Sequence, residues 1–236
     1  MNEELAGFTV PDPKVRAFDI LARVAGFRSM VYGWLALSFY PPDEPLVSAL
    51  ATGTLSAELH ALTSWLGADQ ARLQPGLDAL AQFEGMTMEA LQDTYQRCFG
   101  KSVRRISPRE STYCWRDASD VLGAREDLAQ VLRQQYRQFG VTPQPGQEDH
   151  VAVELELLAY LCEREATSWK ASRAEDAKQM RRQQRNFLDD HLGRWLPEFS
   201  WQLSSVARGS FYANQAALAD TWLEMEYGPG YTAVGA

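Results

Sequence analysis

Apolar side chains recur at intervals of three and four residues along nearly the whole chain, and alternating β-branched runs are almost absent. This spacing places apolar side chains on one face of an α-helix. The segment from residue 15 to 39 is the longest example, with Ala22 and Ala25 on one face, and it ends at Pro41 and Pro42. The periodicity predicts an all-α, bundle-like protein. The expected helices cover residues 15–39, 56–66, 72–83, 88–99, 118–139, 149–170, 175–192, 195–207 and 210–226.

Two prolines and two glycines fall within residues 140–146, which is the clearest linker of the chain. A linker of this composition separates the helical patterns before and after it. It predicts an N-terminal helical lobe at residues 1–140, a hinge at 141–147 and a C-terminal helical lobe at 148–236, with the apolar faces of both lobes meeting at one core. Because a hinge that extends can exchange the same helices between chains, we expect a monomer or a domain-swapped homodimer.

The overall charge excludes one class of function. The formal net charge is −8 and the isoelectric point is near 5.0, whereas a nucleic-acid binder needs a positive face. The first residues are acidic, and the uninterrupted apolar runs are shorter than the roughly 20 residues of a membrane span. We therefore expect a cytoplasmic protein without stable membrane insertion. The three cysteines are widely spaced and odd in number, which predicts free thiols.

A group of polar residues stands where the linker gives way to the next helix. Glu148, Asp149 and His150 are followed by Glu154 within a strongly apolar segment. An aspartate here is a natural N-cap, so we expect Asp149 to accept backbone hydrogen bonds of the first turn. His150 and Glu154 lie one turn apart on one face, where they could pair with each other or with a bound molecule.

The same residues leave a second interpretation open. Asp149, His150 and Glu154, together with His191 or His60, could hold a metal ion, which would make the protein an all-helical metal-dependent hydrolase. No His-Glu-x-x-His motif supports that function. Neither a P-loop nor a Gly-x-Gly-x-x-Gly motif occurs, so no cofactor is expected.

Two further segments contain aromatic and polar residues at close spacing. Residues 95–100 read Tyr-Gln-Arg-Cys-Phe-Gly and lead through a polar loop to Pro-Arg-Glu-Ser-Thr-Tyr at 108–113. Residues 187–199 contain the pattern Phe-x-x-x-His-Leu-x-x-Trp-x-Pro-x-Phe. Taken alone, the aromatic residues of these segments are typical of a helical core. Trp115, beside the loop, could instead line a groove. On a later helix, the basic cluster of Arg181, Arg182 and Arg185 is typical of a solvated helix face.

Together, these three segments resemble the TorD/DmsD/NarJ family of redox-enzyme maturation chaperones. The resemblance implies a helical chaperone and not an enzyme. Its partner would be the molybdenum-cofactor catalytic subunit of an oxidoreductase, whose N-terminal twin-arginine signal is bound until the cofactor is inserted. The signal-recognition surface would fall on Tyr95, Phe99, Pro108, Glu110, Ser111, Tyr113, Asp149, His150 and Glu154. Relatives often have proline where this chain has Gln147.

The chemistry of such a signal fits the residues that the resemblance selects. Paired guanidinium groups bind carboxylates, and an apolar helix-forming stretch binds in a groove lined by aromatic side chains. Asp149, Glu154 and Glu110 could supply the carboxylates. Tyr95, Phe99, Tyr113 and Trp115 could supply the groove.

Overall fold

The computed structural model describes residues 13–100, 105–113 and 121–228 and confirms the all-α fold. Within these ranges the chain forms ten α-helices, one short 3-10 helix and no strand. The helices are α1 (Pro13–Leu37), α2 (Glu44–Ala51), α3 (Thr54–Trp65), α4 (Gln70–Ala81), α5 (Met88–Phe99), η1 (Glu110–Thr112), α6 (Val121–Gln138), α7 (Val151–Lys170), α8 (Ala174–Asp190), α9 (Leu192–Val206) and α10 (Phe211–Tyr227).

Helix α2 was not expected, because the prolines around it were interpreted as terminators. Asp43 caps this helix by accepting a hydrogen bond from the backbone N–H of Leu46, and Pro45 lies in its first turn. Proline is tolerated there because the first N–H groups of a helix have no partner within the helix. A proline cluster followed by a capping aspartate thus ends one helix and begins the next.

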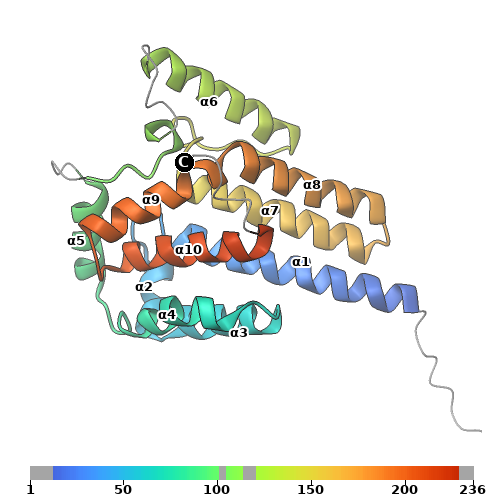
Figure 1. Ribbon diagram of the computed structural model, residues 1–236, viewed down its shortest axis with the longest axis horizontal. Helices are drawn as coiled ribbons and strands as arrows, with labels where there is room; N and C mark the ends of the chain where they lie inside the picture. Colours follow the sequence, from blue (N-terminus) through green and yellow to red (C-terminus); the bar gives the residue numbers. More distant parts are fainter. Residues whose placement is uncertain (1–12, 101–104, 114–120, 229–236) are drawn as a thin grey trace, which may run out of the picture.

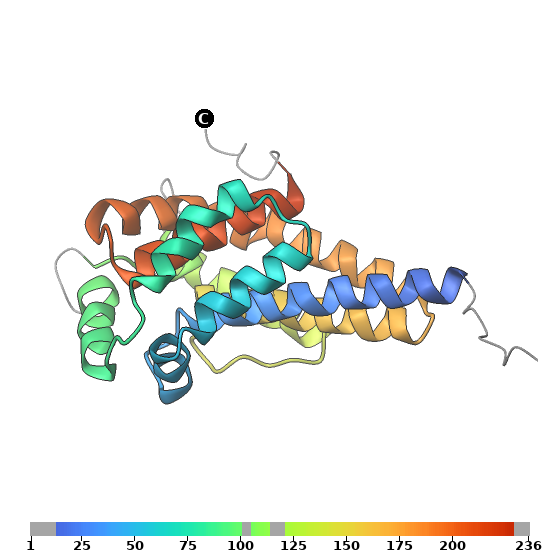
Figure 2. The same ribbon diagram turned by 90° about the horizontal axis from the view of Figure 1, so that it is seen from below.

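One core extends across the linker. Tyr32 and Leu35 of α1, and Phe39 just after it, belong to the same buried cluster as Leu155 of α7 and Phe199 of α9. Figures 1 and 2 show α1 and α7 lying side by side over much of their length, with α8 on one flank of α7. Helices from both ends of the chain therefore share one interior, as their apolar faces predicted. The division into lobes at residues 140 and 148 stays a prediction.

Helix α1 is also long and apolar enough to span a membrane, judged by length and composition over Lys14–Leu37. The expectation from uninterrupted apolar runs missed this segment because Arg23 and Arg28 interrupt it. Core helices of globular proteins meet the same criterion. Here the face of α1 that carries Ala22, Ala25 and Tyr32 is buried in the protein.

A buried ionic network joins four helices at Arg28. Its guanidinium donates to Glu165 of α7 at 3.0 Å and to Gln184 of α8 at 2.6 Å. It also pairs with Glu226 of α10 and donates to the Tyr227 hydroxyl at 3.0 Å. Only 4% of Arg28 is exposed, so the ion pairs lie inside the core between α1, α7, α8 and α10.

The linker between α6 and α7 follows the surface of α7, and α6 lies at the edge of the bundle (Figure 1). Gly140 and Gly146 both have φ near +76°, a conformation that a residue with a side chain rarely adopts. The Tyr160 hydroxyl of α7 donates to the carbonyl of Phe139 at 3.1 Å. Tyr136 of α6 donates to the carbonyl of Glu148 at 3.0 Å. These contacts fix both ends of the linker beside the start of α7.

Candidate functional site

The first two predicted segments meet through a short antiparallel bridge between Arg109 and His150. The backbone N–H of Glu110 donates to the carbonyl of Asp149 at 2.9 Å. The N–H of Val151 donates to the carbonyl of Pro108 at 2.9 Å. Residues 105–113 are therefore attached by main-chain hydrogen bonds to the start of α7, about 40 residues further along the chain.

The predicted N-cap of α7 was wrong by one residue, because His150 occupies that position. Its Nδ1 accepts a hydrogen bond from the backbone N–H of Ala152 at 3.2 Å. Asp149 turns away to the loop, where its Oδ1 accepts from Arg109 at 2.8 Å and its Oδ2 accepts from the N–H of Ser111 at 3.3 Å. The charge of Arg109 and a backbone donor thus draw Asp149 out of the capping position.

His150 is buried and does not pair with Glu154. Its ring stacks on the ring of Tyr40, with centroids 6.1 Å apart and planes 10° from parallel. Burial, followed by the charge of Arg109, lowers the pKa of His150 to about 4. A neutral imidazole agrees with its capping role, because the Nδ1 lone pair must be free to accept.

The third predicted segment places two side chains against the buried acids. His191, which links α8 to α9, lies with its Nδ1 3.1 Å from Glu110 Oε2. Trp195 of α9 donates through Nε1 to Glu154 Oε2 at 3.1 Å. At most 5% of His191, Glu110, Glu154 or Trp195 is exposed. The three segments therefore converge on one buried polar cluster, which we call the Glu110/Glu154 cluster.

Burial controls the protonation of this cluster. Removal from water, then the neighbouring Glu110 carboxylate, hold the pKa of Glu154 well above its ordinary value. The raised pKa favours the neutral carboxylic acid, so Glu154 is a poorer partner for a cation than an ordinary surface glutamate.

The predicted aromatic residues pack against one another in a layer beside the Glu110/Glu154 cluster. Tyr95 and Phe99 of α5 pack edge-on against Tyr212 of α10 at 5.5 and 5.1 Å. Tyr113 stacks on Trp195 at 5.3 Å, and its hydroxyl donates to the carbonyl of Ser107 at 2.8 Å. Each of these aromatic side chains is half-buried or buried. They belong to the core and also reach its edge.

The predicted site residues therefore divide by exposure. Glu110, Ser111, His150 and Glu154 are buried, whereas Tyr95, Phe99, Pro108, Tyr113 and Asp149 are partly exposed. Trp115 lies outside the described residues. Of the three predicted carboxylates, Asp149 is the one that is partly exposed and stands at the edge of the site.

Sequence reasoning missed two residues that contact Asp149 or its neighbour His150. Arg109 stood within the recognised Pro-Arg-Glu segment but was not selected, and it is the ion-pair partner of Asp149. Tyr40, which stacks on His150, is 110 residues away in the sequence and carries no local signal. The charge of Arg109 beside a motif rich in acids was the one clue that sequence reasoning could have used.

The alternative metal site is not supported by this geometry. Asp149 faces Arg109 and His150 caps α7, so the two side chains do not converge on one point. No group of three histidine, cysteine or acidic residues suited to a metal ion occurs in the described parts of the chain. Of the cysteines, Cys98 and Cys162 are free and buried. Cys114 lies outside the described residues.

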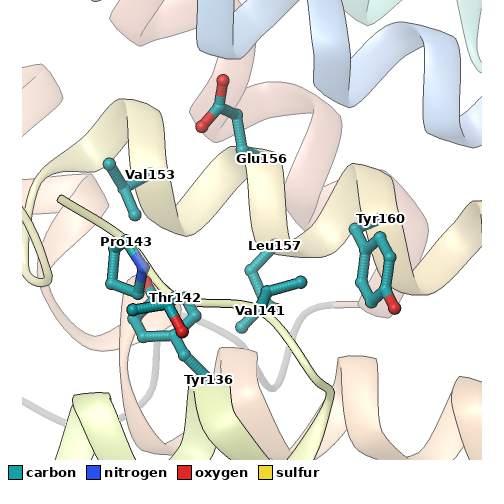
Figure 3. A pocket seen from close by; sticks show the side chains of 8 residues that line it. All are labelled: Tyr136, Val141, Thr142, Pro143, Val153, Glu156, Leu157 and Tyr160. Carbon is teal, nitrogen blue, oxygen red and sulfur yellow. The ribbon is translucent and has the colours of Figure 1, made fainter.

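A small pocket lies between the linker and α7 (Figure 3). Its volume is about 210 Å³, and Val141 and Pro143 of the linker face Leu157 of α7 across it. Glu156 points away from the linker in Figure 3, and its carboxylate accepts from the Tyr40 hydroxyl at 2.6 Å. Small-molecule sites usually measure about 300 Å³ or more. This pocket is smaller and can hold a single apolar side chain.

Comparison with known proteins identifies the family. The profile of the nitrate reductase delta subunit family matches residues 56–200, which include all three predicted segments. The chain belongs to the nitrate reductase delta subunit family. This result confirms the resemblance to the TorD and NarJ type of assembly chaperone.

Individual relatives of this family match different lengths of the chain. A perchlorate reductase assembly chaperone protein from Dechloromonas aromatica is 25% identical over 205 residues, 84% of this chain and 87% of that protein. A selenate reductase assembly chaperone protein from Thauera selenatis is 48% identical over 58 residues, 25% of this chain and 29% of that protein. Chaperone protein TorD from Colwellia psychrerythraea is 34% identical over 84 residues, 36% of this chain and 29% of that protein.

Proposed function

We propose that the protein is a cytoplasmic assembly chaperone for the catalytic subunit of a molybdenum-cofactor reductase. The observation that carries this proposal is the match to the nitrate reductase delta subunit family over residues 56–200. The alignment with a perchlorate reductase assembly chaperone over 84% of the chain adds to it. The chaperone acts by binding and releasing its client, without catalysis.

The client segment that we propose is an N-terminal twin-arginine signal, which the chaperone holds until the cofactor has been inserted. A signal of this kind presents guanidinium groups and an apolar stretch. Asp149 supplies a carboxylate at the edge of the site, with side-chain exposure of 13%. Tyr95, Phe99 and Tyr113 supply partly exposed aromatic surface, and Pro108 is partly exposed as well.

The buried members of the set have a supporting role in this proposal. Glu110 and Ser111 hold the 105–113 segment against Asp149, and His150 caps α7 directly after it. Glu154 is held by Trp195 inside the cluster. These residues position the partly exposed carboxylate of Asp149 and the aromatic layer, and they affect a client only through those groups. Micromolar affinity, about −8 kcal/mol, is enough to mask a signal and still release it.

Calorimetric titration with a synthetic peptide tests this proposal. The peptide carries two adjacent arginines followed by an apolar stretch, and a matched peptide carries two glutamines instead. We expect the arginine peptide to bind the wild-type protein, and Asp149→Asn to weaken binding about tenfold, since a charge-assisted contact is lost. Asp78→Asn, in an exposed carboxylate of α4, is the matched control and should leave affinity unchanged. Equal binding of both peptides would remove the twin-arginine signal from the proposal.

A further inference from the structure

The carboxylate proposed to receive a client arginine is already occupied by an arginine of this chain. Arg109 donates through Nη1 to Asp149 Oδ1 at 2.8 Å and to the carbonyl of Gly146 at 2.6 Å. It also donates through Nη2 to Gln147 Oε1 at 3.2 Å. We propose that Arg109 is an internal competitor, which occupies Asp149 in the free chaperone and is displaced by a guanidinium group of the client. This inference rests on the proposed function, because it requires Asp149 to be the client's contact.

The exposure of the pair permits such an exchange. The side chain of Arg109 is 33% exposed and that of Asp149 is 13% exposed, so the guanidinium lies at the surface. A pair with one partner at the surface separates more easily than a pair in which both charges are cut off from water. A second guanidinium can approach from the solvent side, and its contact with Asp149 must offset the contacts that Arg109 makes with Asp149, Gly146 and Gln147.

The attachment of the 105–113 segment to the start of α7 does not depend on the Arg109 side chain. The hydrogen bonds from Glu110 N–H to Asp149 and from Val151 N–H to Pro108 hold the segment through main-chain atoms. The N–H of Ser111 donates to Asp149 Oδ2 and keeps the carboxylate oriented. When Arg109 swings out, Asp149 Oδ1 is freed while the loop and the carboxylate stay in place.

The neighbouring ion pair between Arg133 and Glu148 is a contrasting case, because its carboxylate is buried. Arg133 of α6 donates to Glu148 Oε1 at 3.0 Å, but the side chain of Glu148 is only 3% exposed. A client could not reach that carboxylate without opening the protein. Loss of Arg133 should therefore lower stability through an unpaired buried charge, with no gain in client affinity.

Competition by Arg109 has a measurable consequence. The apparent affinity for a client is reduced by the fraction of molecules in which Asp149 is free. If the Arg109 contact contributes about 1 kcal/mol, Arg109→Gln should tighten binding of the arginine peptide about fivefold. A residue that only supports the site, or that contacts the client directly, would give weaker binding when removed. The sign of the change therefore distinguishes the competitor from both other roles.

The experiment is a titration of the synthetic arginine peptide into the full-length protein and its variants. We expect tighter binding for Arg109→Gln and affinity near wild type for Arg109→Lys, which keeps the competing charge. In an Asp149→Asn background, Arg109→Gln should change nothing, because the contested carboxylate is gone. Gln147→Ala removes one contact of Arg109 and both charges remain, so it should tighten binding by a smaller factor. It serves as the second variant if Arg109→Gln does not fold.

The outcomes separate this inference from the proposed function. Peptide binding to wild type that is unchanged or weakened by Arg109→Gln or Gln147→Ala overturns the competitor and leaves the chaperone function standing. Binding to Arg109→Gln but not to wild type supports strong competition. No binding to wild type or to any variant overturns the competitor together with the twin-arginine signal as the client segment.

Discussion

The buried network at Arg28 provides the sharpest test of how the helices are held together. We consider Arg28→Met, which keeps most of the apolar volume of the side chain and removes its charge. The variant leaves Glu165 and Glu226 inside the protein, with side-chain exposures of 10% and 5%, without the Arg28 guanidinium. It also removes the donors to Gln184 and to the Tyr227 hydroxyl.

The magnitude follows from which charges remain. Removing one partner of a buried ion pair costs about 3 to 5 kcal/mol, because an uncompensated charge stays in the interior. Glu226 keeps the partly exposed Arg181 at 3.0 Å, and Glu165 keeps Gln184 and Trp169 as donors. These remaining contacts place the expected loss at the lower end, about 3 kcal/mol.

Urea unfolding followed by circular dichroism at pH 7 measures this loss. An unchanged slope of the free energy of unfolding against urea concentration shows that the folded state is retained. The triple variant Arg28→Met/Glu165→Gln/Glu226→Gln should recover most of the stability, because no buried charge is left unpaired. Arg164→Met, at an exposed arginine of α7 that contacts Tyr160, is the matched control and should stay within about 0.5 kcal/mol of wild type. A loss below about 1 kcal/mol for Arg28→Met, or a triple variant no more stable than the single one, would refute the reasoning.

Three other predictions concern pH and the linker. Folding lowers the pKa of His150 from 6.5 to about 4. The free energy of unfolding should therefore fall as pH drops from 6.5 to 4, by an amount on the order of 3 kcal/mol at pH 4. His150→Asn keeps a capping side chain and should flatten this part of the pH profile in thermal melts, whereas His60→Asn, at an exposed histidine, should not. The raised pKa of Glu154 has the opposite effect, because burial of its carboxylate lowers stability as pH rises above 4.5. Glu154→Gln should therefore melt at a higher temperature than wild type at pH 7 and at the same temperature at pH 4. If residues 140–146 act as the hinge of helix exchange, shortening them should change the ratio of monomer to dimer in light scattering, and an unchanged ratio would exclude the linker as the exchange point.

The sequence by itself determined the helical fold and most helix positions. Apolar spacing is a local property, so the expected helix at residues 88–99 matches α5 (Met88–Phe99) and the others differ from their helices by only a few residues. The missed helix, α2, is short and begins within a proline cluster, where the same residues are consistent with a turn. The motif residues were also found, because their identities and spacing within each segment are local.

Only the tertiary structure decided what those residues do. Asp149 and His150 both suit an N-cap, and the choice between them depends on Arg109, which is 40 residues away. Glu110 and His191 are 81 residues apart, and they meet because α8 and α9 pack against α7, to whose start the segment with Glu110 is attached. Burial, which raises the pKa of Glu154 and leaves Asp149 partly exposed at the edge of the site, depends on the packing of the whole chain. Local sequence specifies the helices and the available chemical groups, but long-range contacts decide which of those groups are buried and which lie within reach of a partner.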